Sequence, residues 1–341
     1  MRATIDLSNL SLWLKFCNKL IGSSEFSFGN IYFSYDRGLV VRATDGCLHG
    51  WMKIGECEPF EGEIAIPLRL LKGFLVGESG EFLNLTLMED EIALSSGNET
   101  LRMKLTGKRE KQVPIEHELV AKSDVLNFNK ALNFVTSPLE EGDLALFGSF
   151  EKDLLMFASA RSIICLTRLQ GELMKPFVFS FPYMSARHVV KALEVYAKNV
   201  QLNVGLGEAL LIRSSDFTLQ LCGEHAAFDP RIGDFLQRKE TYVVPRNFQR
   251  FVSKAAWLMP RESTIRIECV RDSMRFFGAY GTVSYRAILP FDCPLRFEFE
   301  VSPHRLRSAL ARMAGRLLIS VGDGFVKIED SAGRTVVVRR L

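Results

Sequence analysis

The chain of 341 residues lacks the features that mark membrane, secreted and zinc-binding proteins. Its longest apolar runs, such as residues 209–212, fall far below the roughly 18 residues that a membrane-spanning helix needs. Its first residues have no apolar segment and no cleavage site of a signal peptide. The seven cysteines are odd in number and never spaced Cys-x-x-Cys, so we expect neither a disulfide framework nor a zinc site. These absences favour a cytoplasmic location.

Motifs that carry catalysis are also missing. The five histidines show no metal-binding spacing, and the sequence has neither a phosphate-binding loop ending in Gly-Lys-Ser/Thr nor a Gly-x-Ser-x-Gly elbow. Gly205-Leu206-Gly207 is followed by no predicted helix, so a hairpin turn explains it better than a dinucleotide site. We therefore predict no enzymatic activity, no metal and no cofactor.

What the sequence does contain is a basic amphipathic stretch that recurs. Residues 303–316 read as a helix opened by Pro303, a residue that the first helical turn tolerates. An apolar stripe with the spacing i, i+3, i+4, i+7 follows from Leu306 to Met313. Arg305, Arg312 and Arg316 fall on another stripe, and the stretch contains no acidic residue.

A unit of strand, helix and three strands repeats six times along the chain. The predicted helices start at Ser8, Pro67, Asp124, Pro182, Pro245 and Pro303, which are 59, 57, 58, 63 and 58 residues apart. Each helix should bury its apolar face against an antiparallel sheet, which is an α+β architecture. Pairing the six units predicts three similar domains, at residues 1–112, 113–238 and 239–341.

Positive charge concentrates in the six predicted helices. Taken as 8–21, 67–76, 123–136, 182–199, 245–259 and 302–316, they hold 15 lysines and arginines against two acids, whereas the rest of the chain holds 28 against 38. A solvated helix face explains any one of them, but such faces normally mix signs. Six faces of one sign indicate an anionic partner, nucleic acid above all. The predicted DNA contacts are Lys15, Lys19, Arg69, Lys72, Lys130, Arg187, Lys191, Lys198, Arg246, Arg250, Lys254, Arg305, Arg312 and Arg316.

Nothing in the sequence suggests that bases are read. It has no zinc finger, no recognition-helix motif and no exposed aromatic pairs on which single strands stack. We therefore expect attraction to the phosphate backbone that is independent of sequence and weakened by salt.

Several local motifs accompany the repeat. They are Ala43-Thr44-Asp45-Gly46 at a strand end, Lys254-Ala255-Ala256-Trp257-Leu258 at a helix end, and the C-terminal run Val336-Val337-Val338-Arg339-Arg340-Leu341. With three similar domains and basic helices, the chain resembles the bacterial sliding clamp, the β subunit of DNA polymerase III. The resemblance implies a homodimeric ring in which twelve helices surround duplex DNA, and which tethers DNA polymerase and is opened by a clamp loader.

The resemblance also implies two protein contacts. Trp257 and Leu258 would lie in the dimer interface. A pocket for a short peptide of partner proteins would be formed by Leu155, Ala158, Ala160, Ile163, Pro230, Val337, Arg339 and Arg340. The sequence departs from the family's pattern at Ala158-Ser159-Ala160-Arg161, where Thr-Asp-Gly-His is usual, and at Arg339, where an apolar residue is usual. A divergent clamp-like adaptor that does not encircle DNA is the alternative, and an enzyme on the same scaffold is a third hypothesis.

Overall fold

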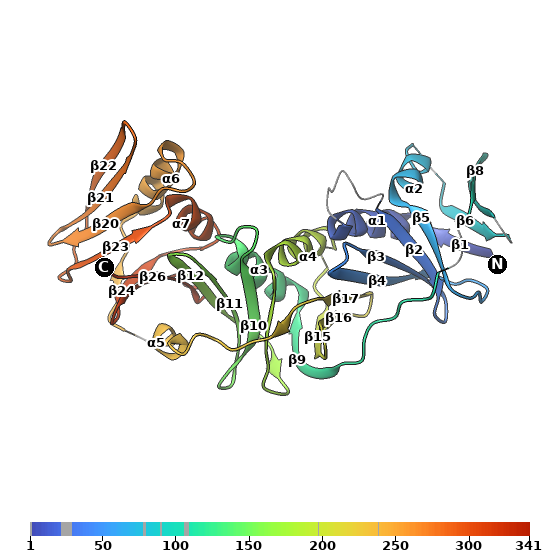
Figure 1. Ribbon diagram of the computed structural model, residues 1–341, viewed down its shortest axis with the longest axis horizontal. Coiled ribbons are helices and arrows are strands. Elements are labelled where there is room, and N and C mark those ends of the chain that lie inside the picture. Colours follow the sequence, from blue (N-terminus) through green and yellow to red (C-terminus); the bar gives the residue numbers. More distant parts are fainter. Residues whose placement is uncertain are drawn as a thin grey trace. The chain divides into compact units, whose positions relative to one another are not determined.

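The computed structural model describes residues 2–21, 29–77, 80–88, 91–105, 109–196, 198–237 and 239–341. A strand predicted at residues 24–28 lies outside them. Within these ranges the predicted α+β class and the sixfold repeat are confirmed, since each repeat runs strand, helix, strand, strand, strand (Figure 1).

The elements of the first two repeats follow the predicted order. They are β1 (Arg2–Asp6), α1 (Leu7–Ile21), β2 (Asn30–Tyr35), β3 (Leu39–Thr44), β4 (Leu48–Gly55), then β5 (Glu63–Pro67), α2 (Leu68–Phe74), β6 (Phe82–Leu87), β7 (Glu91–Ser96) and β8 (Glu99–Lys104).

The third and fourth repeats keep the same order. They are β9 (Glu118–Asp124), α3 (Val125–Thr136), β10 (Leu144–Phe150), β11 (Asp153–Ala160), β12 (Ile163–Leu169), then β14 (Val178–Pro182), α4 (Tyr183–Tyr196), β15 (Gln201–Leu206), β16 (Leu210–Arg213) and β17 (Phe217–Leu221).

The last two repeats complete the chain. They are β19 (Tyr242–Val243), α6 (Phe248–Leu258), β20 (Ile265–Val270), β21 (Ser273–Tyr280), β22 (Val283–Pro290), then β23 (Phe297–Val301), α7 (Pro303–Leu310), β24 (Leu318–Val321), β25 (Phe325–Glu329) and β26 (Arg334–Arg339). Three short elements were not predicted, namely β13 (Glu172–Leu173), β18 (Glu224–His225) and α5 (Ile232–Leu236).

The repeats assemble into two compact units. The first comprises residues 1–129 and 187–224, and the second comprises 130–186 and 225–341. In the first unit the sheet β9-β15-β16-β17-β4-β3-β2-β5 joins strands of two repeats where β17 pairs with β4, and β1-β6-β7-β8 forms a smaller sheet. In the second unit β12 pairs with β26 in the same way, and β22-β21-β20-β23 forms the smaller sheet. The division into three domains stays a prediction.

Helix α1 shows how the sequence places a helix on its sheet. The predicted apolar face of α1, from Leu10 to Cys17, is buried and packs on β3 and β4. Trp13 stacks on Phe16 with ring centroids 4.8 Å apart, and Phe16 reaches Phe217 of β17 at 5.4 Å. Gly50 of β4 permits this approach, because a Cβ there would lie 2.4 Å from Leu20 Cδ1. One helix thus covers the seam between β4 and β17.

One disulfide crosses the same seam. Cys47 and Cys222 are bonded, with Cα atoms 5.0 Å apart, and the Cys222 N–H donates to the Cys47 carbonyl at 2.9 Å. The other five cysteines are free. The expectation that the cysteines form no disulfide is therefore wrong for this pair, because residues 175 positions apart in sequence are brought together by the pairing of β17 with β4.

Candidate nucleic-acid interface

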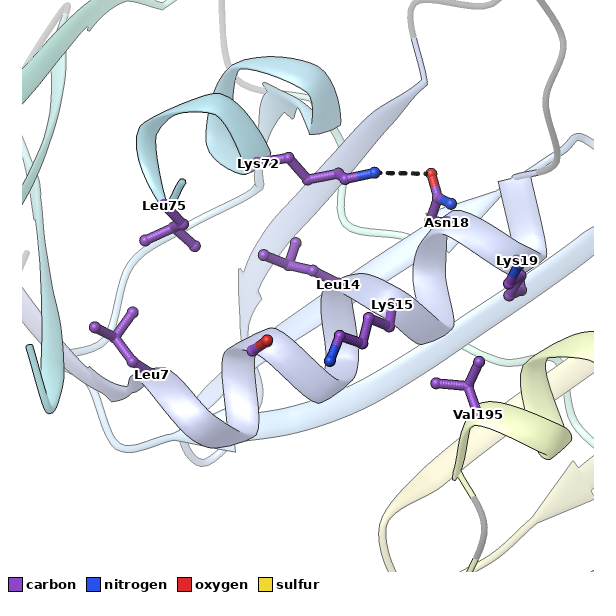
Figure 2. A pocket seen from close by; sticks show the side chains of 9 residues that line it. Leu7, Leu14, Lys15, Asn18, Lys19, Lys72, Leu75 and Val195 are labelled. Atoms are coloured by element: carbon purple, nitrogen blue, oxygen red, sulfur yellow. Dashed lines mark hydrogen bonds between the residues drawn. The ribbon is translucent and has the colours of Figure 1, made fainter. Parts of the chain in front are cut away.

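The basic residues of α1 and α2 surround a crevice in the first unit. Lys15 and Lys19 of α1 and Arg69 and Lys72 of α2 are all exposed, as predicted for residues that meet a partner. Lys15, Lys19 and Lys72 line a crevice of about 500 Å³ between the helices (Figure 2). Lys72 Nζ lies 3.4 Å from Asn18 Oδ1 across it.

Helix α4 adds further cations to this unit. Arg187 is exposed, and burial together with the positive charges of Arg187 and Lys19 lowers the pKa of Lys191. That effect requires the cations of α4 and α1 to lie within electrostatic reach of each other. Lys198 is less available, because its Nζ lies 3.5 Å from Asp216 Oδ2.

In the second unit the cations near α6 and α3 are also exposed. Arg246 just precedes α6, Arg250 and Lys254 lie on it, and Lys130 lies on α3. None of the four forms an ion pair with a carboxylate in the part of the chain that the structure describes. Such unpaired cations stay free to meet an external anion.

Arg305 is a correction to the predicted set. Its side chain is only 7% exposed, so it cannot reach a phosphate in solvent. Its guanidinium donates to Glu140 Oε2 at 2.5 Å, to Asp143 Oδ2 at 3.1 Å and to the Pro138 carbonyl at 3.1 Å. A buried cation must be paired, and here the partners belong to the segment between α3 and β10.

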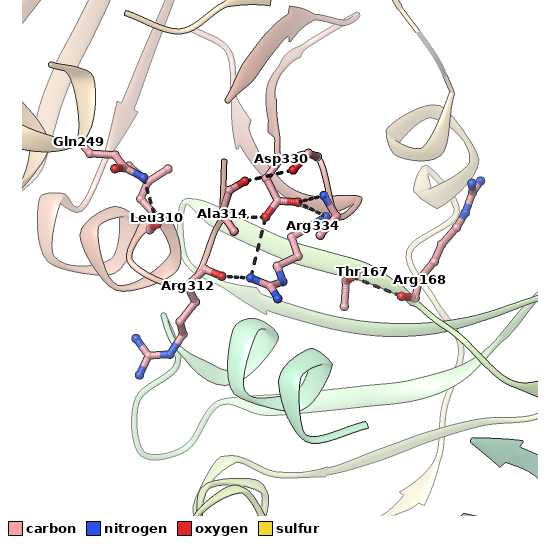
Figure 3. Close-up of polar contacts among 10 residues, drawn as sticks. Thr167, Arg168, Gln249, Leu310, Arg312, Ala314, Asp330 and Arg334 are labelled. Atoms are coloured by element: carbon pink, nitrogen blue, oxygen red, sulfur yellow. Dashed lines mark hydrogen bonds and ion pairs between the residues drawn. The ribbon is translucent and has the colours of Figure 1, made fainter. Parts of the chain in front are cut away.

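The predicted helix of residues 303–316 is also shorter than expected, since α7 ends at Leu310. The Ala314 N–H donates to the buried Asp330 carboxylate at 2.9 Å instead of continuing the helix (Figure 3). Gly315 follows with φ of 72°, outside the helical region. Arg312 and Arg316 therefore lie beyond the helix, although both are exposed, and Arg312 Nε donates to Asn133 Oδ1 at 2.8 Å.

Five of the residues predicted to form the peptide pocket are buried. Leu155, Ala158, Ala160, Ile163 and Val337 are each 2% exposed or less. Leu155 and Val337 belong to a buried cluster with Ile232 and Phe235, two residues of the unpredicted helix α5. Helix α5 therefore helps to bury Leu155 and Val337, and a pocket formed by all eight residues stays a prediction. The remaining three, Pro230, Arg339 and Arg340, are exposed.

The predicted interface residues are on the surface. Trp257 is 81% exposed and Leu258 is 47% exposed at the end of α6. Sequence reasoning missed Ile288, which is 68% exposed on β22. The alternation of the strand could have revealed it. Tyr285 and Leu289 face the buried side of β22, so Ile288 falls on the opposite, outer face with Arg286.

Sequence reasoning also missed the apolar residues of the crevice. Leu7, Leu14, Leu75 and Val195 line it beside the lysines. Among the described residues no helix is long and apolar enough to cross a membrane.

Comparison with known proteins decides which fold this is. No protein-family model matches the sequence, and no curated protein matches it. The DNA polymerase III subunit beta of Pseudomonas aeruginosa superposes with a TM-score of 0.84 at 12% identity, over 100% of both chains. The chain has the sliding-clamp fold.

Other solved clamps agree along the whole chain. The DNA polymerase III beta subunit of Thermotoga maritima gives a TM-score of 0.79 at 14% identity, covering 100% of this chain and 99% of that one. The beta subunit from the DNA polymerase of Streptococcus pyogenes gives 0.79 at 13% identity, covering 100% of both. The predicted resemblance to the sliding clamp is thus confirmed for the fold, at identities that fit a divergent sequence.

Proposed function

We propose that this protein is a DNA sliding clamp, in which two copies close into a ring around duplex DNA and tether DNA polymerase and other replication or repair proteins. The observation that carries the proposal is the excess of exposed cations over exposed acids on the described helices. Lys15 and Lys72 in one unit and Arg250 and Lys254 in the other face solvent without carboxylate partners among the residues described. Phosphates at regular spacing are the partner that such charges suit, whatever the base sequence.

Ring closure has support in each of the two units. The smaller sheet of the first unit ends in β8 and that of the second unit ends in β22, and neither strand has a partner on its outer edge within the described ranges. Free edges pair readily with another strand. Exposed apolar residues accompany both, namely Val76 and Phe82 in the first unit and Trp257 and Ile288 in the second. Head-to-tail pairing of β8 with β22 of a second copy would close the ring.

The remaining parts of the proposal follow from this role. The protein would have no catalytic activity, would act in the cytoplasm and would depend on a separate clamp loader. Pro230, Arg339 and Arg340 would stay accessible to partner proteins, whereas Leu155 and Val337 would become more accessible if α5 moved. The alternative, an adaptor that binds without encircling, differs in how it holds DNA.

The deciding experiment measures retention on DNA of different topology. After loading, the protein should stay on closed circular DNA and slide off the same DNA once it is cut. Replacing Arg246, Arg250 and Lys254 by Glu should abolish retention, and raising salt from about 50 to about 200 mM should weaken binding by about a thousandfold. The matched control replaces the exposed Lys152, Arg213 and Arg275, which lie off the helices, and should be retained.

Two outcomes would contradict the proposal. Equal retention on circular and linear DNA would favour the adaptor. Retention of the variant with Glu at 246, 250 and 254 would show that these three cations do not contact DNA. Trp257→Asp tests closure separately, since burying an unpaired carboxylate is costly. It should convert a dimer into a monomer by light scattering, whereas an intact dimer would place the interface elsewhere.

A further inference from the structure

The crevice between α1 and α2 combines two surfaces that duplex DNA alone does not explain. Its floor is aliphatic, formed by Leu7, Leu14, Leu75 and Val195. Figure 2 shows Leu7 and Leu75 facing each other across it, with Lys72 reaching from α2 toward Asn18 of α1. Leu14 is buried and forms part of the floor.

The charged residues described at the rim of the crevice are positive. Lys15, Lys19 and Lys72 line it, and no aspartate or glutamate does among the residues that the structure describes. None of the three lysines has an ion-pair partner among the residues described. Ammonium groups gathered without a counter-charge favour an anion at this point.

Shape and chemistry narrow the class of that anion. The volume of about 500 Å³ suits a small molecule, whereas a partner helix, about 10 Å across, needs a longer groove. In the described ranges no aromatic side chain lines the crevice, so these residues offer a nucleotide base no stacking surface. Burial of the aliphatic floor stabilises a complex only when the ligand also has an apolar surface.

We propose that this crevice binds a small amphiphilic anion, with an aliphatic chain on the leucines and a carboxylate or phosphate head on Lys15, Lys19 and Lys72. A consequence for DNA binding also follows, and it rests on the proposed function, because the same lysines are proposed DNA contacts. Ligand and DNA therefore compete, and bound ligand lowers retention on circular DNA.

Calorimetry with the full-length protein tests the binding. Octyl phosphate and octanoate are the probes, octanol lacks the charge, and inorganic phosphate lacks the chain. One molecule of an octyl anion should bind per chain, about tenfold or more tighter than octanol or inorganic phosphate. The ratio of octyl phosphate to octanoate affinity then identifies the preferred head group. Equal affinity for octanol and both anions would overturn the proposal.

Two variants, one at the C-terminal end of α2 and one on the helix, separate the crevice from DNA binding. Leu75→Asn should weaken octyl phosphate binding about tenfold while DNA retention stays unchanged. The matched control Leu70→Asn alters an exposed leucine of α2 outside the crevice and should change neither. Unweakened binding by the Leu75 variant, with thermal unfolding like that of the wild type, would overturn the proposal.

Lys72→Ala should weaken the binding of both ligand and DNA, and octyl phosphate should displace the wild-type protein from circular DNA. If the wild type binds octyl phosphate but is never retained on circular DNA, the proposed function fails and the crevice remains a ligand site. If it is retained but octyl phosphate does not bind, only the crevice proposal fails.

Discussion

Two pairs of helices, each from two consecutive repeats, differ in how closely the helices pack. In the second unit α6 and α7 pack along their length, with Gln249 Nε2 donating to the Leu310 carbonyl at 3.2 Å (Figure 3) and His304 Nε2 lying 2.8 Å from the Met259 carbonyl. In the first unit α1 and α2 meet over few residues, and the 3.4 Å contact from Lys72 to Asn18 spans the crevice. We call α6 and α7 the closed pair, and α1 and α2 the open pair.

The difference shows that one sequence pattern can serve two purposes. In the closed pair, Arg305 of α7 is drawn inside and satisfied by Glu140 and Asp143. In the open pair, Lys15 and Lys72 keep their charges toward solvent. A basic stripe on a helix therefore predicts an anionic partner only where the neighbouring segment supplies no carboxylate.

The largest expected difference in stability between the units comes from the disulfide, which lies in the unit with the open pair. A bond that closes a loop of 175 residues stabilises by up to about 5 kcal/mol in the chain-entropy model. Reduction should therefore lower the urea midpoint of the first unit. Tryptophan fluorescence measures it selectively, because Trp13 and Trp51 are buried there and Trp257 of the second unit is exposed.

The control for this prediction is Cys57→Ser, which removes a free cysteine of the same unit and should respond to reduction as the wild type does. Hydrogen exchange of β25 and β26 in the second unit should not change on reduction. The denatured, unreduced protein should titrate five thiols, and seven after reduction. Seven thiols before reduction would show that the pair is not bonded.

The next largest loss of stability should come from replacing Arg305, the buried cation of the closed pair. Arg305→Met removes charge-assisted hydrogen bonds to Glu140 and Asp143, and we expect a loss of about 1.5–3 kcal/mol. The lower end is favoured because Glu140 is half-exposed and solvent screens it. Hydrogen exchange of α7 amides measures the loss.

Arg312→Met is the comparison for that prediction. Arg312 is exposed, so the substitution should change stability by less than about 0.5 kcal/mol. It should instead weaken DNA retention, which Arg305→Met should not do at equal folded fraction. If both variants lowered retention alike and neither lost stability, Arg305 would be a phosphate contact after all.

The parts of the fold that sequence predicts are those with local causes. The apolar face of α1 from Leu10 to Cys17, the helix start at Pro303 and the turn at Gly324, with φ of 73°, each depend on residues a few positions apart. Because those local signals recur about every 58 residues, they also establish the repeat.

The parts that sequence misses depend on distant residues. Arg305 meets Asp143, 162 positions away, and Cys47 meets Cys222. Helix α5 spans only five residues, too few for a periodic pattern, yet Phe235 helps to bury Leu155 and Val337, two of the residues predicted to form a pocket. Which cation is paired, and which apolar residue is covered, follows from tertiary packing that periodicity does not encode.

The smallest expected effect is an acid dependence of the unit with the open pair. Burial opposes ionisation of Asp45, but a hydrogen bond from His188 at 3.2 Å and backbone N–H groups of Leu48 and Cys47 outweigh it and lower the pKa of Asp45 below its ordinary 3.8. A carboxyl whose folded pKa is lowered stabilises the fold above its unfolded pKa, and that stabilisation is lost as pH falls through the folded value.

Urea midpoints from tryptophan fluorescence between about pH 7 and about pH 2 should therefore separate the wild type from Asp45→Asn. The gap between them should stay constant above pH 3.8 and close below it, because the protonated Asp45 no longer differs in charge from asparagine. Asp229→Asn is the control in the other unit, where the hydrogen bond from Arg231 lowers the pKa of Asp229. It should leave the fluorescence curve unchanged. Parallel curves for the wild type and Asp45→Asn over the whole range would show that the contact between His188 and Asp45 does not stabilise the first unit.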